Sequence, residues 1–112
     1  MQRAFGPTVY LLASRRNGTL YAGVTSDLIG RIHQHREGLV AGFSRDYCVK
    51  HLVWFEPHAT MELAIQREKR IKKWNRAWKL ELIEKANSEW RDLAEEIGFG
   101  PLVQAGFPLS RE

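Results

Sequence analysis

The sequence predicts an α+β fold in which a small three-stranded sheet, mixed or antiparallel, is flanked by helices in the order β-β-α-β-α-α. Two apolar runs separated by an Asn-Gly turn predict a hairpin near the N-terminus. Two later segments carry apolar residues every three or four positions, as one face of a helix does. The length of 112 residues is typical of one domain.

The hairpin is predicted over residues 9–24. Residues 9–13 form a short apolar run rich in strand-forming residues, and residues 19–24 return as the second strand. Asn17-Gly18 lies between them. Asn and Gly tolerate the positive φ that tight hairpins need, so these two residues predict the turn.

The first helix is predicted over residues 28–37, after the capping residue Asp27 and before Gly38. Three of its residues share an inward face at spacing i, i+4 and i+7: Leu28, Ile32 and His35. Residues 38–47 carry glycine and serine and are expected to form a loop. Residues 49–56 are expected to form the third strand, which a proline closes.

The main helix is predicted over residues 61–74, with Thr60 as its cap. Glu68 lies on its apolar stripe, whose other members are Met61, Ala64, Ile65 and Ile71. A further helix is predicted over residues 77–86, with three expected core residues: Trp78, Leu82 and Ile83.

The C-terminal part is expected to hold one more helix over residues 88–97, followed by an extended or weakly ordered tail from residue 98. The predicted division is therefore a domain over residues 1–87 and a helical extension with a tail over residues 88–112.

The bulk composition favours a globular protein with an anionic partner. Hydrophobic residues make up 44% and charged residues 27%, while the net charge is +4 and the pI about 9.5.

The single Cys48 excludes an internal disulfide and fits a reducing compartment. The apolar run at residues 9–13 is too short for a signal peptide or a membrane span, so a cytoplasmic location is expected. His33, His51 and His58 do not share metal-ligand spacing with Cys48, which argues against zinc.

Five polar residues form the candidate catalytic set: Tyr10, Tyr21, Arg31, His35 and Glu68. Two phenols, a guanidinium, an imidazole and a carboxylate are the groups needed to cut a phosphodiester with one divalent metal. Arg31 and His35 are four residues apart on one helix face, where an arginine can bind phosphate and a histidine can relay a proton. The alternative is a solvated Arg31, a hydrogen-bonded core His35 and two tyrosines that pack in the core.

Glu68 is informative because a carboxylate on an apolar stripe is costly if it stays unpaired. It must pair with a base, bind a metal or reach solvent. A magnesium site often uses only one or two carboxylates, with water and substrate phosphate as the other ligands. The alternative is a structural ion pair with Arg31, Arg67 or Lys72.

A basic segment surrounds Glu68 and carries the tryptophans Trp74 and Trp78. Its candidate nucleic-acid-binding residues are Lys69, Arg70, Lys72, Lys73 and Arg76. Such a stripe would bind DNA phosphates without sequence preference and in a salt-sensitive way. The alternative is a solvated helix face with its tryptophans in the core. Residues 81–96 are acidic, and this polarised charge favours binding.

About two thirds of the chain, residues 8–83, resembles a GIY-YIG nuclease domain, most of all its small stand-alone bacterial members. The resemblance is carried by Thr8-Val9-Tyr10 and Tyr21-Ala22-Gly23 at the two motifs, by Arg31 and His35 on the next helix, and by Arg67-Glu68-Lys69-Arg70-Ile71-Lys72-Lys73-Trp74 at the metal-binding segment. Thr8 replaces a glycine and Ala22 a larger aliphatic residue, and neither position carries the chemistry.

The resemblance implies a role for each site residue. Glu68 would hold one Mg²⁺ or Mn²⁺, and Arg31 would neutralise charge on the phosphate. Tyr21 or Tyr10 would deprotonate or position the attacking water, supported by His35.

Two further positions follow from the same resemblance. Gly23 would let the backbone turn closely beside the site. An asparagine that some relatives place near the metal corresponds here to Asn75 or to no residue.

The predicted function is a metal-dependent endonuclease that hydrolyses DNA and leaves a 5′-phosphate and a 3′-hydroxyl, with repair or recombination as the family-level role. One alternative is a nucleic-acid-binding module of this fold with little or no turnover. Another is a structural protein whose basic face meets an acidic partner. The expected partners are the DNA backbone and a protein that supplies targeting, because many family nucleases gain specificity from an added region or partner; no membrane is expected.

Overall fold

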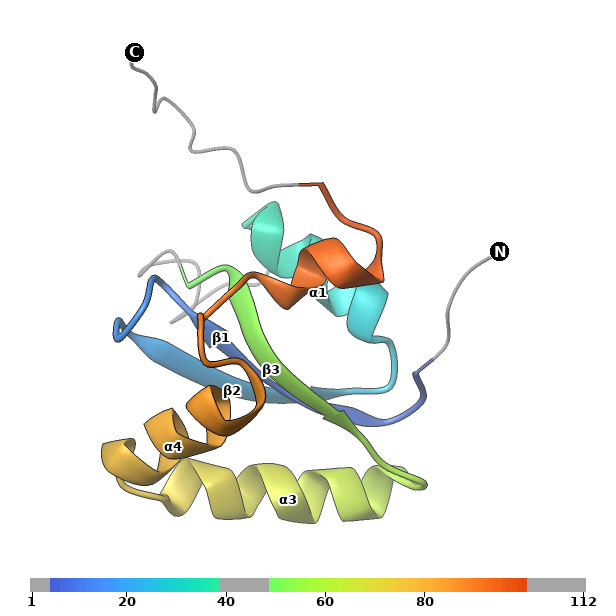
Figure 1. The fold of residues 1–112 in the computed structure, drawn as a ribbon. Coiled ribbons are helices and arrows are strands. Elements are labelled where there is room, and N and C mark those ends of the chain that lie inside the picture. The colour runs from blue at the N-terminus through green and yellow to red at the C-terminus, as the bar shows by residue number, and fades with distance from the viewer. Residues whose placement is uncertain (1–4, 39–48, 101–112) are drawn as a thin grey trace.

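A computed structural model describes residues 5–38 and 49–100. The elements in chain order are β1 (Thr8–Ala13), β2 (Leu20–Thr25), α1 (Leu28–Arg36), β3 (His51–Pro57), α3 (Met61–Lys73), α4 (Arg76–Ala86) and the 3₁₀ helix η1 (Leu93–Ile97). The strands form an antiparallel sheet in the order β2-β1-β3, which confirms the predicted α+β class. Helices α3 and α4 lie on one face of this sheet, and α1 and η1 lie on the other (Figure 1).

Strand β1 is the central strand, and its alternate residues face the two helical layers. Val9, Leu11 and Ala13 belong to the core beneath α3 and α4, whereas Tyr10 and Leu12 belong to the core beneath α1 and η1. All five side chains are buried. Burial on both faces explains why this strand is a continuous apolar run rather than an alternating one.

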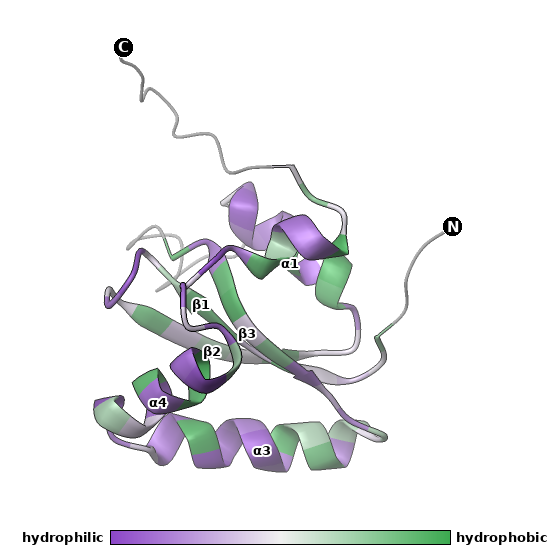
Figure 2. Cartoon of the chain, viewed as in Figure 1, coloured by the Kyte–Doolittle hydropathy of each residue, from purple (hydrophilic) through white to green (hydrophobic). Residues whose placement is uncertain are grey.

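The predicted turn and helix starts are confirmed. Asn17 has φ of 58° in the hairpin loop, which is closed by a backbone hydrogen bond from Ser14 N–H to the carbonyl of Thr19 at 2.9 Å. Asp27 caps α1 by accepting a hydrogen bond from Gly30 N at 3.1 Å, and Thr60 caps α3 in the same way. The residues of α1 that are buried are those of the predicted stripe: Leu28, Ile32 and His35. Hydrophobic and hydrophilic residues alternate along α3 (Figure 2), and its buried face carries Ala64, Glu68 and Ile71.

Two predictions about the C-terminal helices are wrong. Trp78 was expected in the core, but 55% of it is exposed; α4 instead buries Ile83 against the sheet. The helix predicted over residues 88–97 is reduced to η1. Trp90 has φ of 57°, which no α-helix allows, and its indole N–H donates to Glu84 at 2.9 Å.

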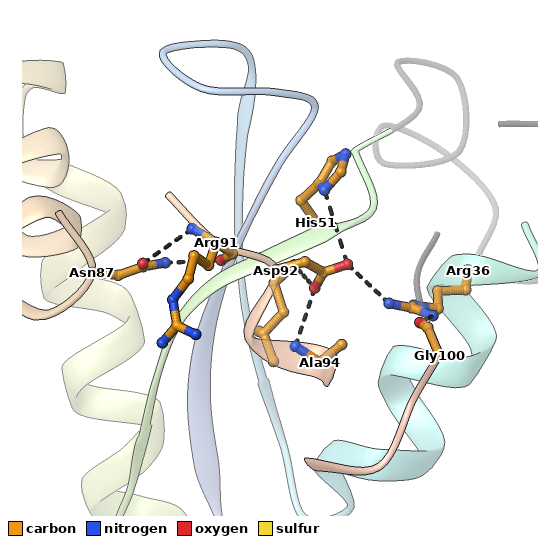
Figure 3. A network of polar contacts seen from close by, with 8 residues as sticks. Arg36, His51, Asn87, Arg91, Asp92, Ala94 and Gly100 are labelled. Carbon is orange, nitrogen blue, oxygen red and sulfur yellow. Dashed lines mark hydrogen bonds and ion pairs between the residues drawn. The ribbon is translucent and has the colours of Figure 1, made fainter. Parts of the chain in front are cut away.

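The segment after α4 is attached to the sheet through Asp92 (Figure 3). The Asp92 carboxylate accepts hydrogen bonds from the backbone of Leu52 and Ala94, each at 3.1 Å, and pairs with Arg36 at 2.8 Å. Arg36 also donates to the carbonyl of Gly100 at 2.7 Å. This carboxylate therefore joins β3, α1 and η1.

Other predictions fall partly outside the described residues, among them the loop at 38–47, of which only Gly38 is described, and the tail beyond residue 100. Within residues 5–38 and 49–100, every helix is too short or too polar to cross a membrane.

Candidate active site

The phenol of Tyr10 lies directly over Gly23. These two residues are opposite each other in the β1–β2 ladder. A Cβ atom on residue 23 would lie 2.4 Å from both the hydroxyl oxygen and the Cζ atom of Tyr10. Gly23 therefore leaves room for the phenol to cross the edge strand, which is a different role from the backbone turn that the resemblance implied.

Three rings meet at this point. The Tyr10 hydroxyl lies 3.0 Å from Nε2 of His35, a hydrogen bond between buried groups. The ring of Tyr21 lies with its centroid 5.3 Å from that of His35 and 6.4 Å from that of Tyr10. The hairpin supplies the two tyrosines, and α1 places His35 above them because His35 lies on its buried face.

Arg31 lies one turn before His35 on α1 and is half-buried. The positive charge of Arg31 affects the pKa of both Tyr10 and His35, the two partners of the hydrogen bond. Burial, and to a smaller extent the nearby charge of Arg31, lowers the pKa of His35 to about 4. Burial raises the pKa of Tyr10, as does Tyr21, while Arg31 opposes the shift. At neutral pH the imidazole is therefore neutral and the phenol protonated.

The carboxylate of Glu68, on α3, acts electrostatically on the same phenol. Its negative charge contributes to the raised pKa of Tyr10, after the larger effects of burial and Tyr21. Glu68 is buried, with 7% of the residue exposed, and its Oε2 lies 2.5 Å from Nζ of Lys72 one turn along the helix. The sequence allowed three ion-pair partners for Glu68, and the structure shows the pair with Lys72. Arg67, another of the three, pairs with Glu56 instead.

The residues present fit a hard divalent cation. Within the described ranges, no three His, Cys, Asp or Glu side chains are grouped as metal ligands. A magnesium ion does not need such a group, because it usually keeps several waters and takes one or two carboxylates. The Glu68 carboxylate offers oxygen ligands and already attracts a cation, the ammonium of Lys72. Glu68 is thus the candidate ligand for Mg²⁺ or Mn²⁺.

The predicted DNA-binding residues differ in their surroundings. Lys69, Arg70, Lys72 and Lys73 are exposed along α3. Arg76, also exposed, donates from Nη2 to the carbonyls of Asn17 and Gly18 in the hairpin turn, at 2.7 Å each. Its guanidinium thus contributes to holding α4 against the hairpin.

Asn75 caps α4 and is not directed to the site by any contact that the structure describes. Its Oδ1 accepts a hydrogen bond from Trp78 N at 2.9 Å. An asparagine that precedes a helix is a typical cap, so the sequence carried a signal for this role. The i, i+4 spacing of Glu68 and Lys72 was likewise a signal for their ion pair.

Comparison with known proteins defines the class first. Residues 6–81 match the model of the GIY-YIG catalytic domain, a domain of the nuclease superfamily. This span is well over half of the chain, and the protein belongs to the GIY-YIG family.

Its relatives include small bacterial proteins named UPF0213. Those of Staphylococcus aureus strains Mu3 and N315 are each 36% identical over 67 residues, which cover 60% of this chain and 82% of the relative. The solution NMR structure of the UPF0213 protein BH0048 from Bacillus halodurans is similar with a TM-score of 0.50 and 27% identity. That match covers 77% of this chain and 90% of the other.

Proposed function

We propose that this protein is a divalent-metal-dependent endonuclease that hydrolyses DNA phosphodiester bonds, with repair or recombination as its setting. The observation that carries the proposal is the buried hydrogen bond between Tyr10 and His35, with the ring of Tyr21 edge to face with His35. The charge of Arg31 acts on the pKa of both groups and that of Glu68 on the pKa of Tyr10. Membership of the GIY-YIG family supports the same reaction class.

Tyr10 and His35 are assigned to proton transfer. The Tyr10 phenol is protonated, so it acts as a base only if its own proton leaves at the same time. The neutral His35 imidazole, hydrogen-bonded to it through Nε2, is the acceptor for that proton. A bound phosphate brings negative charge, which offsets Arg31 and makes protonation of His35 easier than in the free protein. Tyr21, half-exposed beside the pair, is assigned to positioning the water.

Arg31 and Glu68 are assigned to the phosphate. The guanidinium of Arg31 neutralises the non-bridging oxygens. The carboxylate of Glu68 would hold the divalent ion, which when bound would polarise the phosphate and stabilise the leaving 3′ oxygen. The exposed lysines of α3 hold the neighbouring phosphates of the strand.

A cleavage assay on supercoiled plasmid, single-stranded and branched DNA, with Mg²⁺, Mn²⁺ or EDTA, tests this proposal. Glu68→Gln removes the charge but keeps the shape, and Glu62→Gln is the matched control because Glu62 is exposed on the first turn of the same helix. Metal-dependent cutting is expected in the wild type and in Glu62→Gln, and a loss of at least about a hundredfold in Glu68→Gln.

DNA affinity in EDTA separates chemistry from binding. It is expected to stay within a few-fold in Glu68→Gln, because the exposed cations are unchanged. Cleavage by Glu68→Gln at the wild-type rate would contradict the assignment of Glu68 as the metal ligand. A wild type that binds every substrate and cuts none would instead be a binding module with the GIY-YIG fold.

A further inference from the structure

An exposed aromatic groove lies where α3 turns into α4. Its walls come from Trp74, Trp78 and Leu82, and Glu81 and Lys85 complete the lining around about 270 Å³. The indoles of Trp74 and Trp78 meet edge to face with centroids 5.8 Å apart. The indole of Trp78 is 55% exposed, and tryptophan is enriched among the residues that dominate binding interfaces.

We propose that this groove holds an unpaired base of a single-stranded DNA segment next to the cleavage site. Aromatic side chains beside cations are the usual platform for single strands, because every base offers a flat face for stacking. This inference rests on the proposed nuclease function, to which it adds a substrate class: DNA with an unpaired stretch.

The charge around the groove fits this occupant. Lys85 lines it, and the exposed Lys73 and Lys79 directly neighbour its two tryptophans in the sequence. Glu81 disfavours a phosphate inside the groove but can accept a hydrogen bond from a base amino group. The base therefore stacks on the exposed face of the Trp78 indole, and the phosphates stay outside the groove beside Lys85 and the neighbouring lysines.

A protein occupant fits less well. A stable protein interface buries about 800 Å² on each partner, and ligand pockets are commonly about 300–1,000 Å³. A groove of about 270 Å³ with five lining residues suits one flat ring better than a helix or a second copy of the chain.

The position of the groove matches a strand held at Glu68. Trp74 is the C-cap of α3, the helix that carries Glu68. The groove therefore begins where the helix with the candidate metal ligand ends.

Binding in EDTA, measured by fluorescence anisotropy, tests the inference. The probes are a labelled twelve-nucleotide oligothymidylate, the same strand with abasic sites throughout, and a blunt twelve-base-pair duplex. Trp78→Ala is expected to weaken oligothymidylate binding about tenfold, and to change the other two by less than twofold. Trp78→Phe should restore most of the affinity, because it keeps a ring that can stack.

Leu63→Ala is the matched control, since Leu63 is the other exposed large hydrophobic residue on the described surface, 49% exposed near the opposite end of α3. It should leave all three affinities unchanged. Equal losses for the base-bearing and the abasic strand would overturn the inference, as would no loss at all. A dimer in sedimentation velocity that Trp78→Ala dissociates would also overturn it, because a second copy would then cover the groove.

These measurements need no turnover and so are independent of the cleavage test. A protein that never cuts DNA but shows the base-dependent loss keeps this inference and loses the proposed function. If cleavage depends on Glu68 but Trp78→Ala binds the three probes as well as the wild type does, the proposed function stands and this inference is lost.

Discussion

The hydroxyl of Tyr10 lies 3.0 Å from Nε2 of His35, and both groups are buried beneath α1. Because the phenol keeps its proton and the imidazole is neutral at pH 7, we assign the bond as O–H donating to a nitrogen lone pair. A buried neutral pair of this kind is stable at rest and can move one proton when the charge nearby changes.

Tyr10→Phe should separate chemistry from folding. The ring contacts to Tyr21 and His35 remain, whereas the hydroxyl is lost. Cleavage is expected to fall by about 10²–10⁴-fold, the usual size of an acid–base contribution. The free energy of unfolding should fall by about 1–3 kcal/mol, because His35 loses a buried partner. Urea unfolding and single-turnover cleavage check both, and an unchanged cleavage rate would remove Tyr10 from the mechanism.

Gly23→Ala should displace the phenol without touching a charged group. The new Cβ would lie 2.4 Å from two Tyr10 atoms, so we expect a destabilisation of about 1–3 kcal/mol and weaker cleavage. Gly100→Ala is the control, since a Cβ there meets no atom within 4 Å. In a Tyr10→Ala background the Gly23→Ala penalty should largely disappear, and full additivity in urea unfolding would refute the clash.

The stability of the fold should depend on pH through His35. Its pKa falls from 6.5 to about 4 on folding, so the unfolded chain binds the proton first as the pH drops. Stability from this group is complete above pH 6.5, declines towards pH 4 and is then lost, a change on the order of 1–3 kcal/mol. Urea unfolding at several pH values should show a flatter profile for His35→Gln. Parallel profiles for the two proteins would contradict the lowered pKa.

Lys72→Met should strengthen metal binding. The ammonium of Lys72 lies 2.5 Å from the Glu68 carboxylate and competes with a divalent ion for it. Because Lys72 is largely exposed, the pair is worth at most about 1 kcal/mol, and the Kd for Mn²⁺ should fall no more than about fivefold. Calorimetric titration measures this, with the exposed Lys69→Met as control. Weaker binding in Lys72→Met would show that the lysine orients the carboxylate instead.

The cations of α3 and α4 should respond differently to mutation. Charge reversal at Lys69 and Lys73, both exposed, should weaken DNA binding and make its dependence on log salt shallower by about two. Arg76→Ala should instead lower the free energy of unfolding by about 1 kcal/mol, because two turn carbonyls lose their donor. A steep loss of DNA affinity in Arg76→Ala with unchanged stability would reverse this assignment.

Local signals in the sequence predicted much of this architecture. The Asn17 turn, the caps at Asp27 and Thr60, and the inward stripe that ends at His35 each depend on a few neighbouring residues. The prediction that the five candidate catalytic residues belong to one site depended on the resemblance, because Glu68 comes from a helix on the other face of the sheet from α1.

The features that could not be predicted depend on contacts between distant segments. Whether Trp78 is buried or exposed depends on how α4 lies on the sheet, and hydrophobicity alone placed it wrongly in the core. The contact of Arg76 with the carbonyls of the hairpin turn joins segments far apart in the sequence, and its predicted role in DNA binding stays a prediction. The helix expected over 88–97 is interrupted by tertiary contacts of Asn87 with Val53 and by the backbone of Trp90.

We expect the contacts of the Asp92 carboxylate to make the cooperative folding unit longer than the family motif. The family match ends at residue 81, but the amide of Leu52 and the guanidinium of Arg36 find their acceptor at residue 92. A fragment cut after residue 87 would leave both donors unpaired, at about 1–3 kcal/mol each, in a domain whose total stability is about 5–15 kcal/mol. Deletion variants and domain fusions of this chain should therefore keep the sequence through at least Gly100.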